Sequence, residues 1–226
     1  SYASSAPFNL YSHHLYPGAY YEFVTMMAEN ASPGCADAVR SALLDAQATL
    51  VNSHDDRLGE AAADVGICHG TIPKYIQSTK LFSRELMLVI ATHFANYNMD
   101  YYPPGPDQDL YKACQIFQDE DLTPAAKVRA FLLLDDKDSD CFDLMTEQPP
   151  GPNATISASD WSGVGAGPEG FYWEYISCQL LPQTGLSDAS MFPPRKWTWE
   201  WETEHCMSRF DWKPSPQALE QEFGFD

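Results

Sequence analysis

A cluster of acidic residues near the middle of the chain has the spacing of a calcium-binding loop. Asp136, Asp138, Asp140 and Glu147 match positions 1, 3, 5 and 12 of an EF-hand, whose oxygens would converge on Ca²⁺. Position 6, however, holds Cys141 where a glycine makes the required turn, and two prolines follow where the exiting helix should continue. A solvated acidic loop is therefore the favoured interpretation, and a calcium-binding adhesive module is the minor alternative.

Histidine and serine residues, which could serve a metal site or nucleophilic catalysis, are scattered along the chain. His13 and His14 are adjacent and cannot share one face of a regular element, while His93 lacks an acidic or histidine partner four residues later. The nucleophile-elbow pattern G-x-S-x-G is absent, and the glycine-rich run 163–170 follows no predicted strand. We therefore expect surface or core histidines, and no catalytic residue, metal or cofactor site in this chain.

An aromatic string near the C-terminal end could bind a ligand. If the segment Trp197-Thr198-Trp199-Glu200-Trp201 were extended, its three indoles would share one face. Such a stripe can stack on sugars or prolines. Large aromatic side chains more often fill cores, so core packing is the favoured interpretation.

Cysteine usage bears on the compartment. The chain has six cysteines and none of the close C-x-x-C spacings typical of a zinc or redox site. Three disulfides in a secreted or endomembrane protein are favoured, with reduced buried thiols as the alternative. Two glycosylation sequons agree with this: one at Asn153 in a Pro/Gly-rich stretch, and a weaker one at Asn30, where a proline follows the sequon.

The overall charge excludes several partners. The chain has 13 Lys and Arg against 32 Asp and Glu, a formal charge of −19, which repels nucleic acids and anionic membranes. The longest apolar run, 86–91, is far shorter than the roughly 20 residues of a membrane span. We expect neither nucleic-acid binding nor membrane insertion.

Helical elements are expected to supply the scaffold. Amphipathic spacing predicts helices over 20–28 and 34–51, and a longer helix within 73–97 whose run 86–91 is apolar on all sides and therefore central. A further helix should begin at Thr123-Pro124 and bury Val128, Phe131 and Leu132.

The remaining segments are predicted to be less regular. Residues 1–10 are typical of a strand end, 147–170 of a long Pro/Gly/Ser-rich loop, and the aromatic tail 171–226 of short elements without a clean period. The result is a mainly helical body whose loops are pinned by cysteines.

The tail also carries an ordered series of motifs. It runs Trp173-x-Tyr175-x-x-Cys178, Met191-Phe192, Trp197, Cys206, Phe210, Pro214-x-Pro216 and Phe223-Gly224. Two earlier segments are Ser4-Ser5-Ala6-Pro7 and Met99-Asp100-Tyr101-Tyr102-Pro103. In this order and spacing, over almost the whole chain, they resemble the serine carboxypeptidase S28 family, whose members cleave next to proline at chain ends.

The resemblance implies a mainly α fold, a disulfide-pinned helical cap domain inserted in an α/β-hydrolase with sheet stubs at both ends. Residues 1–12 would belong to the hydrolase core, 13–222 to the cap and 223–226 to the return into the core. The nucleophile serine would lie shortly before Ser1, and the triad acid and histidine after Asp226. By similarity, Cys35 pairs with Cys114, Cys68 with Cys141 and Cys178 with Cys206.

Substrate-lining residues follow from the same resemblance. They are Glu174, Gln179, Leu180 and Met191. A carboxylate at Glu174 could pair with a substrate's free amino terminus, as in a dipeptidyl peptidase; an ordinary surface glutamate is the alternative. The family usually has Thr-Glu where this chain has Gln179-Leu180, and a glycine where it has Asp211. A divergent or inactive member is therefore a further alternative.

The leading hypothesis is the substrate-gating cap of an S28-like serine exopeptidase acting on proline-containing peptides. Its partners would be the remaining hydrolase portion of the same precursor, the peptide substrate and, in a homodimer, a second copy. The expected location is secreted or lysosomal/vacuolar. The rival hypothesis is a non-catalytic secreted binding or structural protein that uses the tryptophan stripe.

Overall fold

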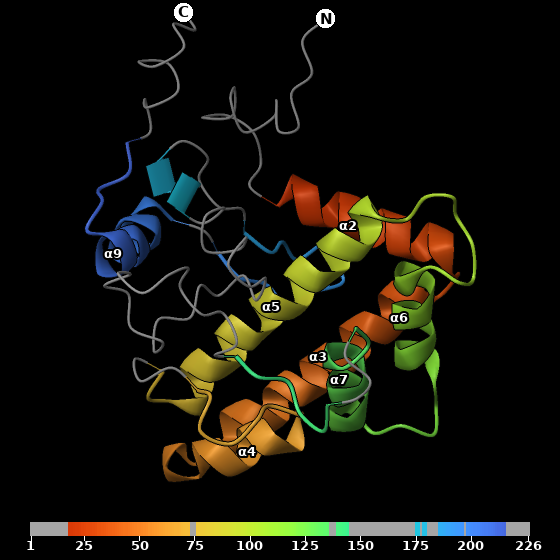
Figure 1. Ribbon diagram of the computed structural model, residues 1–226, viewed down its shortest axis with the longest axis horizontal. Coiled ribbons are helices and arrows are strands. Elements are labelled where there is room, and N and C mark those ends of the chain that lie inside the picture. The colour runs from red at the N-terminus through yellow and green to blue at the C-terminus, as the bar shows by residue number, and fades with distance from the viewer. Residues whose placement is uncertain are drawn as a thin grey trace, which may run out of the picture.

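Helices make up the regular structure of this chain (Figure 1). The computed structural model describes residues 18–72, 76–135, 139–144, 175–176, 178–179, 185–196 and 198–215. In chain order its elements are α2 (Ala19–Ala31), α3 (Cys35–Asn52), the 3₁₀ turn η1 (Asp55–Arg57), α4 (Leu58–Asp64), α5 (Thr79–Met99), α6 (Asp109–Gln118), α7 (Pro124–Leu132) and α9 (Trp199–Phe210). Within these residues the only β-type pairings are two isolated bridges, so the predicted mainly helical fold is confirmed.

The four predicted helices, α2, α3, α5 and α7, are present, and local signals at the starts of three of them explain where they begin. The Thr123 hydroxyl accepts a hydrogen bond from the Ala126 N–H at the start of α7, with Pro124 in the first turn. Ser78 caps α5 in the same way through the Leu81 N–H. The turn before α3 needs Gly34, whose φ of 83° lies in the left-handed region that glycine adopts without strain.

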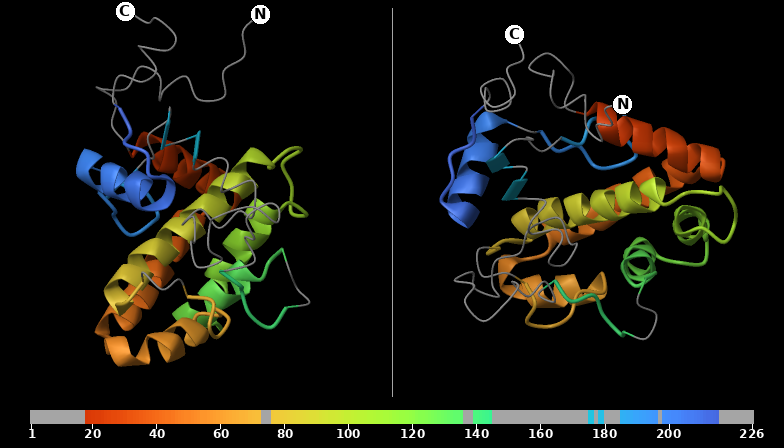
Figure 2. Two further views of the ribbon diagram at one scale, coloured as in Figure 1. Left: turned by 60° about the vertical axis from the view of Figure 1, so that its left-hand side comes forward. Right: turned by 45° about the horizontal axis from the view of Figure 1, so that its top comes forward.

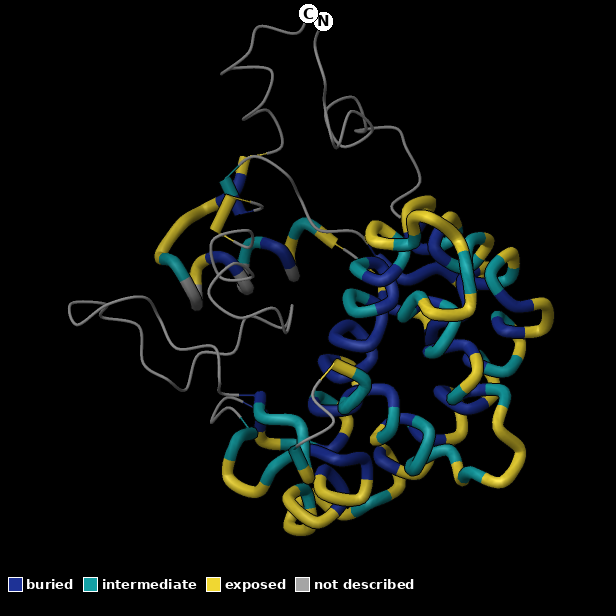
Figure 3. The backbone as a smooth tube through the Cα atoms, turned by 45° about the vertical axis from the view of Figure 1, so that its right-hand side comes forward, coloured by how far each residue is buried: buried dark blue, intermediate teal, exposed yellow. Residues whose placement is uncertain are grey.

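Helix α5 is the centre of the core, as predicted. Every residue from 86 to 91 is buried, and α2, α3 and α6 pack around the helix. Phe94 on α5 stacks on Phe131 of α7 with ring centroids 4.7 Å apart, and it also contacts Phe117 and Phe192. Figure 3 shows buried positions concentrated on the inner sides of the helices.

Three disulfides tie this body together. Cys35–Cys114 joins the start of α3 to α6, Cys68–Cys141 joins the loop after α4 to residues 139–144, and Cys178–Cys206 joins residues 178–179 to α9. No cysteine in the chain is left free. These are the same three pairs that the resemblance implies, and they fit an oxidising compartment.

Residues 185–196, the return segment, lie against the helical body beside α2 (Figure 2). Arg40 of α3 donates to the carbonyl oxygens of Asp188 and Ser190. The Thr25 hydroxyl of α2 accepts from the Met191 N–H at 2.9 Å. The segment therefore belongs to the core as much as the helices do.

A buried ion pair completes the attachment of the return segment. Arg195 Nη2 lies 3.3 Å from Glu85 Oε1 of α5, and both side chains are almost fully buried. Arg195 also pairs through its backbone with Leu186 in an antiparallel bridge. The two ends of the segment are thus fixed to each other and to the central helix.

The structure removes the basis of one alternative and adds a helix that the sequence analysis missed. Residues 199–210 form α9, so the extended conformation that the tryptophan stripe requires is not present from Trp199 onward. Two residues are about 200° apart around a helix, so side chains two positions apart point to different faces. Helix α6 was also missed, although Leu110, Ala113, Cys114 and Phe117 have helical spacing and are all buried.

Several predictions fall outside the described residues. They are the strand end at 1–10, the hydrolase stubs at 1–12 and 223–226, the long loop at 147–170, and half of the EF-hand-like loop 136–147, including Asp136, Asp138 and Glu147. Among the described helices, none is long and apolar enough to cross a membrane.

Candidate functional site

The residues predicted to line a substrate site have different environments. Gln179 is half-buried beside the Cys178–Cys206 disulfide. Met191 is only 1% exposed and packs in the hydrophobic core, so its burial does not favour direct contact with a substrate. Glu174 and Leu180 lie outside the described residues, and their roles stay predictions.

The unit around α9, made of residues 175–176, 178–179 and 199–215, presents exposed apolar side chains. The Tyr175 ring meets Phe210 edge to face at 5.4 Å, and Tyr175 itself is 40% exposed. Met207 and Trp212 are also exposed. The α9 unit is thus held by a disulfide and a ring contact, and its surface carries both apolar and polar groups.

Helix α9 ends at a residue with unusual backbone geometry. Asp211 has a φ of 51°, in the left-handed region where glycine is favoured and aspartate is tolerated. The resemblance expects a glycine at this position, and the geometry gives the physical reason. Asp211 therefore follows α9 at some cost in backbone strain.

A buried carboxylate sits inside the α9 unit. Cys178, Glu202 and Cys206 form the only group of potential metal ligands found among the described residues. Both sulfurs are joined in the disulfide, so they cannot act as thiolate ligands. This cluster is structural and gives no support to a metal site.

The described histidines have the ordinary environments that the sequence favours. His54 and His69 are exposed. The His93 ring packs edge to face against Phe131 and Phe142, with centroids 6.2 and 5.7 Å away. Of the acidic loop, Asp140 is described, and its backbone carbonyl accepts a hydrogen bond from Arg129.

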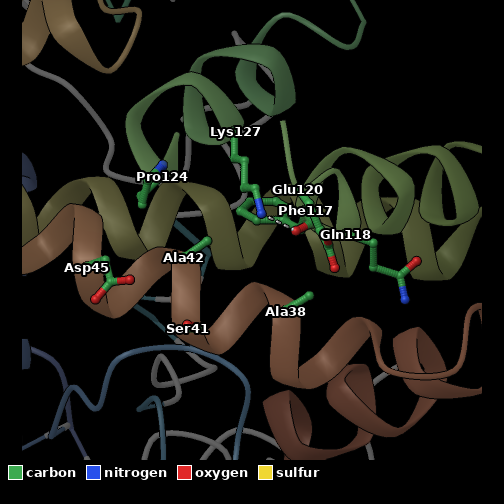
Figure 4. A pocket seen from close by; sticks show the side chains of 9 residues that line it. All are labelled: Ala38, Ser41, Ala42, Asp45, Phe117, Gln118, Glu120, Pro124 and Lys127. Atoms are coloured by element: carbon green, nitrogen blue, oxygen red, sulfur yellow. Dashed lines mark hydrogen bonds between the residues drawn. The ribbon is translucent and has the colours of Figure 1, made fainter. Parts of the chain in front are cut away.

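A groove runs along α3, where small side chains leave space below α6 and α7 (Figure 4). Its first part has a volume of about 460 Å³ and is lined from α3 by Ala38, Ser41, Ala42 and Asp45. Its second part, about 430 Å³, continues along α3 toward α4, and Pro124 borders both. Sequence reasoning missed this groove, although small residues three to four positions apart on α3 were a visible signal.

The two cations that line the groove, Lys127 and Arg129, are bonded to backbone carbonyl oxygens. Lys127 donates to the Phe117 carbonyl oxygen at 2.7 Å, which satisfies the C-terminal end of α6 (Figure 4). Arg129, in the second part, donates to the Asp140 carbonyl oxygen. Because both cations donate hydrogen bonds to backbone carbonyl oxygens, the groove resembles a packing or docking surface more than an acyl-transfer site.

No family model matches this chain. The features of the described residues that could serve a function are the exposed apolar groups of the α9 unit and the groove along α3.

Proposed function

We propose that this chain is the helical cap of an S28-like serine exopeptidase that acts on proline-containing peptides. The observation that supports this proposal most is the position of the two ends of the helical body. The start of α2 and the segment after α9 lie at the same end of the molecule, away from α4 (Figures 1 and 2). A domain inserted into another must leave and return on one side of its host.

The proposed role is to gate access to a catalytic centre in the hydrolase portion of the same precursor. A cap excludes water and restricts which end of a peptide can enter. This requires a rigid body, and three disulfides together with the buried Arg195–Glu85 pair provide rigidity here. The catalytic serine, histidine and acid would come from the hydrolase portion.

The α9 unit is the part of the cap that we assign to the substrate. It lies at the end of the molecule where the chain enters and leaves, and it contains Gln179 (Figure 1). Glu174, close by in the sequence, would pair with the free amino terminus of a peptide. In the parent enzyme, Glu174→Gln should raise KM for peptides with a free amino terminus and leave N-acetylated peptides unaffected. Equal effects on both would contradict this role.

The test of the proposal is fluorophosphonate labelling of the native preparation, followed by intact mass under reducing and non-reducing conditions. A label on a heavier species, or on a companion fragment that copurifies with this chain, supports the cap. An unlabelled species near 25.3 kDa plus any glycan contradicts it.

A non-catalytic secreted binding or structural protein with a cap-like fold is the second candidate. Exposed Tyr175, Met207 and Trp212 on the α9 unit favour it, because such groups can serve a protein partner. The extended tryptophan stripe no longer supports it, since residues 199–210 are helical. The same labelling experiment separates the two candidates.

A further inference from the structure

The corner between α2 and α3 places the two key residues of a glycosylation sequon in opposite environments. Asn30, near the end of α2, is exposed. Ser32, two residues later, is only 7% exposed. Its hydroxyl donates to Gln118 Oε1 at 2.8 Å and accepts from Gln115 Nε2 at 3.2 Å.

This corner is held closed by several independent contacts. The Glu29 carboxylate accepts from the Gly34 and Ala36 N–H groups and so caps α3. Gln118 Nε2 donates to the Pro33 carbonyl oxygen at 2.8 Å. The Cys35–Cys114 disulfide then fixes the start of α3 to α6, three residues after Ser32.

N-glycosylation requires simultaneous access to the asparagine amide and the serine hydroxyl of the sequon. In the transfer, the Asn amide nitrogen bonds to the sugar C1 of a polyprenyl-pyrophosphate-linked oligosaccharide. The C1–O bond breaks, the lipid pyrophosphate leaves with its electron pair, and the amide proton passes to a base of the transferase. In the folded chain the Ser32 hydroxyl is covered and bonded, so the transferase cannot reach both groups.

We propose that Asn30 is an N-glycosylation site that accepts its glycan only before the Cys35–Cys114 disulfide closes the α2–α3 corner. Glycan transfer and disulfide closure then compete, and the outcome of that competition sets the occupancy of Asn30. This inference depends on the oxidising compartment and not on the proposed enzyme function.

The attached glycan would stand on an apolar face of α2. Phe23 and Met26 are 48% and 51% exposed, and they precede Asn30 by seven and four residues, which is helical spacing. The glycan is therefore placed to shield these two side chains from solvent and from other proteins.

The competition can be tested by translating the 226-residue chain, behind a cleavable signal sequence, with microsomes that glycosylate. The fraction of chains that carry a glycan at Asn30 is measured by mass spectrometry in the chain without substitutions, in C35S/C114S and in C178S/C206S. In the chain without substitutions we expect partial glycan occupancy at Asn30, because disulfide formation is slow enough to compete with glycosylation. In C35S/C114S the occupancy should rise about twofold. The matched control C178S/C206S lacks a distant disulfide and should not change Asn30, and occupancy at Asn153 should be equal in all three chains.

Three results would overturn the proposal. They are no glycan at Asn30 in any chain, equal Asn30 occupancy in C35S/C114S and in the chain without substitutions, or the same increase in Asn30 occupancy in both disulfide variants. The shielding is tested separately by peroxide oxidation of Met26, which should be about twofold slower in the glycosylated chain than in N30Q. Met99, 67% exposed at the end of α5, is the internal control, and equal Met26 rates would show that the glycan does not cover this face.

Discussion

At the scale of single residues, burial determines how much the loss of one partner of an ion pair changes stability. The Arg195–Glu85 pair has side chains only 4% and 8% exposed, whereas Arg57 and Glu60 form a closer pair, at 2.7 Å, with both side chains about two-thirds exposed. Removing one partner of a buried pair leaves the other charge desolvated and uncompensated, while water replaces a lost partner at the surface.

Glu85→Gln is therefore expected to lower the free energy of unfolding by about 3 kcal/mol, because Arg195 loses its charged partner in the core. Glu60→Gln should leave stability unchanged. Urea denaturation under non-reducing conditions measures both variants. Similar effects of the two substitutions would show that the return segment does not depend on this pair.

Burial also acts on tyrosine ionisation. Burial raises the pKa of Tyr21 from 10.0 to about 12, an effect partly offset by a hydrogen bond with Thr92. Burial, with a hydrogen bond from the Tyr97 hydroxyl to Asp135 Oδ2 at 2.8 Å, also raises the pKa of Tyr97. In both cases the folded chain holds the phenolic proton more tightly than the unfolded chain.

Stability should accordingly fall as pH rises above 10, since the contribution of Tyr21 is full below its unfolded pKa and is lost toward about 12. At a pH of about 11 the loss from Tyr21 is about 1 kcal/mol. Thermal melting of the unmodified chain and of Tyr21→Phe between pH 8 and 11 measures it. The two curves should converge at alkaline pH, and parallel curves would contradict the assignment.

At the scale of elements, the end of α9 shows how backbone geometry restricts residue type. Asp211 is exposed, so its effect on stability comes mainly from its φ of 51° rather than from side-chain packing.

Asp211→Gly should stabilise the chain by about 0.5 to 1 kcal/mol, because glycine adopts this conformation without strain. Asp211→Ala is the matched control and should destabilise it, since alanine tolerates positive φ less well than aspartate. The shift in thermal melting temperature measures both. A loss of stability in the glycine variant would mean that the Asp211 side chain contributes more than its backbone strain costs.

At the scale of the whole molecule, disulfides join segments that are distant in the sequence. Cys35–Cys114 closes a loop with a sequence separation of 79, while Cys178–Cys206 closes one of 28. In the chain-entropy model, the longer loop restricts the unfolded ensemble more.

Cys35→Ala/Cys114→Ala should thus destabilise the chain by about 4 to 5 kcal/mol, and Cys178→Ala/Cys206→Ala by about 3 to 4 kcal/mol. Denaturation of each double variant in urea, compared with the unmodified chain, tests this order. The reverse order would indicate that native packing around the α9 unit, and not loop closure, determines the stabilisation there.

The helices were predicted where local signals were strong. The Thr123 cap, the Gly34 turn and the apolar run 86–91 act within a few residues, so the sequence alone indicated α3, α5 and α7. Helix α9 was missed because its acidic sequence, WEWETEHCMSRF, has no clear apolar stripe, and its position depends on the Cys178–Cys206 bond. The role of Met191 was equally beyond local signals, since its burial results from packing against distant helices.

The sequence by itself determined the helical class of this protein, its acidic composition and the location of its strongest helices. These properties depend on composition and on contacts between near neighbours. Only the tertiary structure decided that Arg195 meets Glu85 across 110 residues, that Ser32 is covered while Asn30 is exposed, and that residues 199–210 are helical. Each of these depends on which distant segments the core brings together, and that choice is made by the packing of the whole chain.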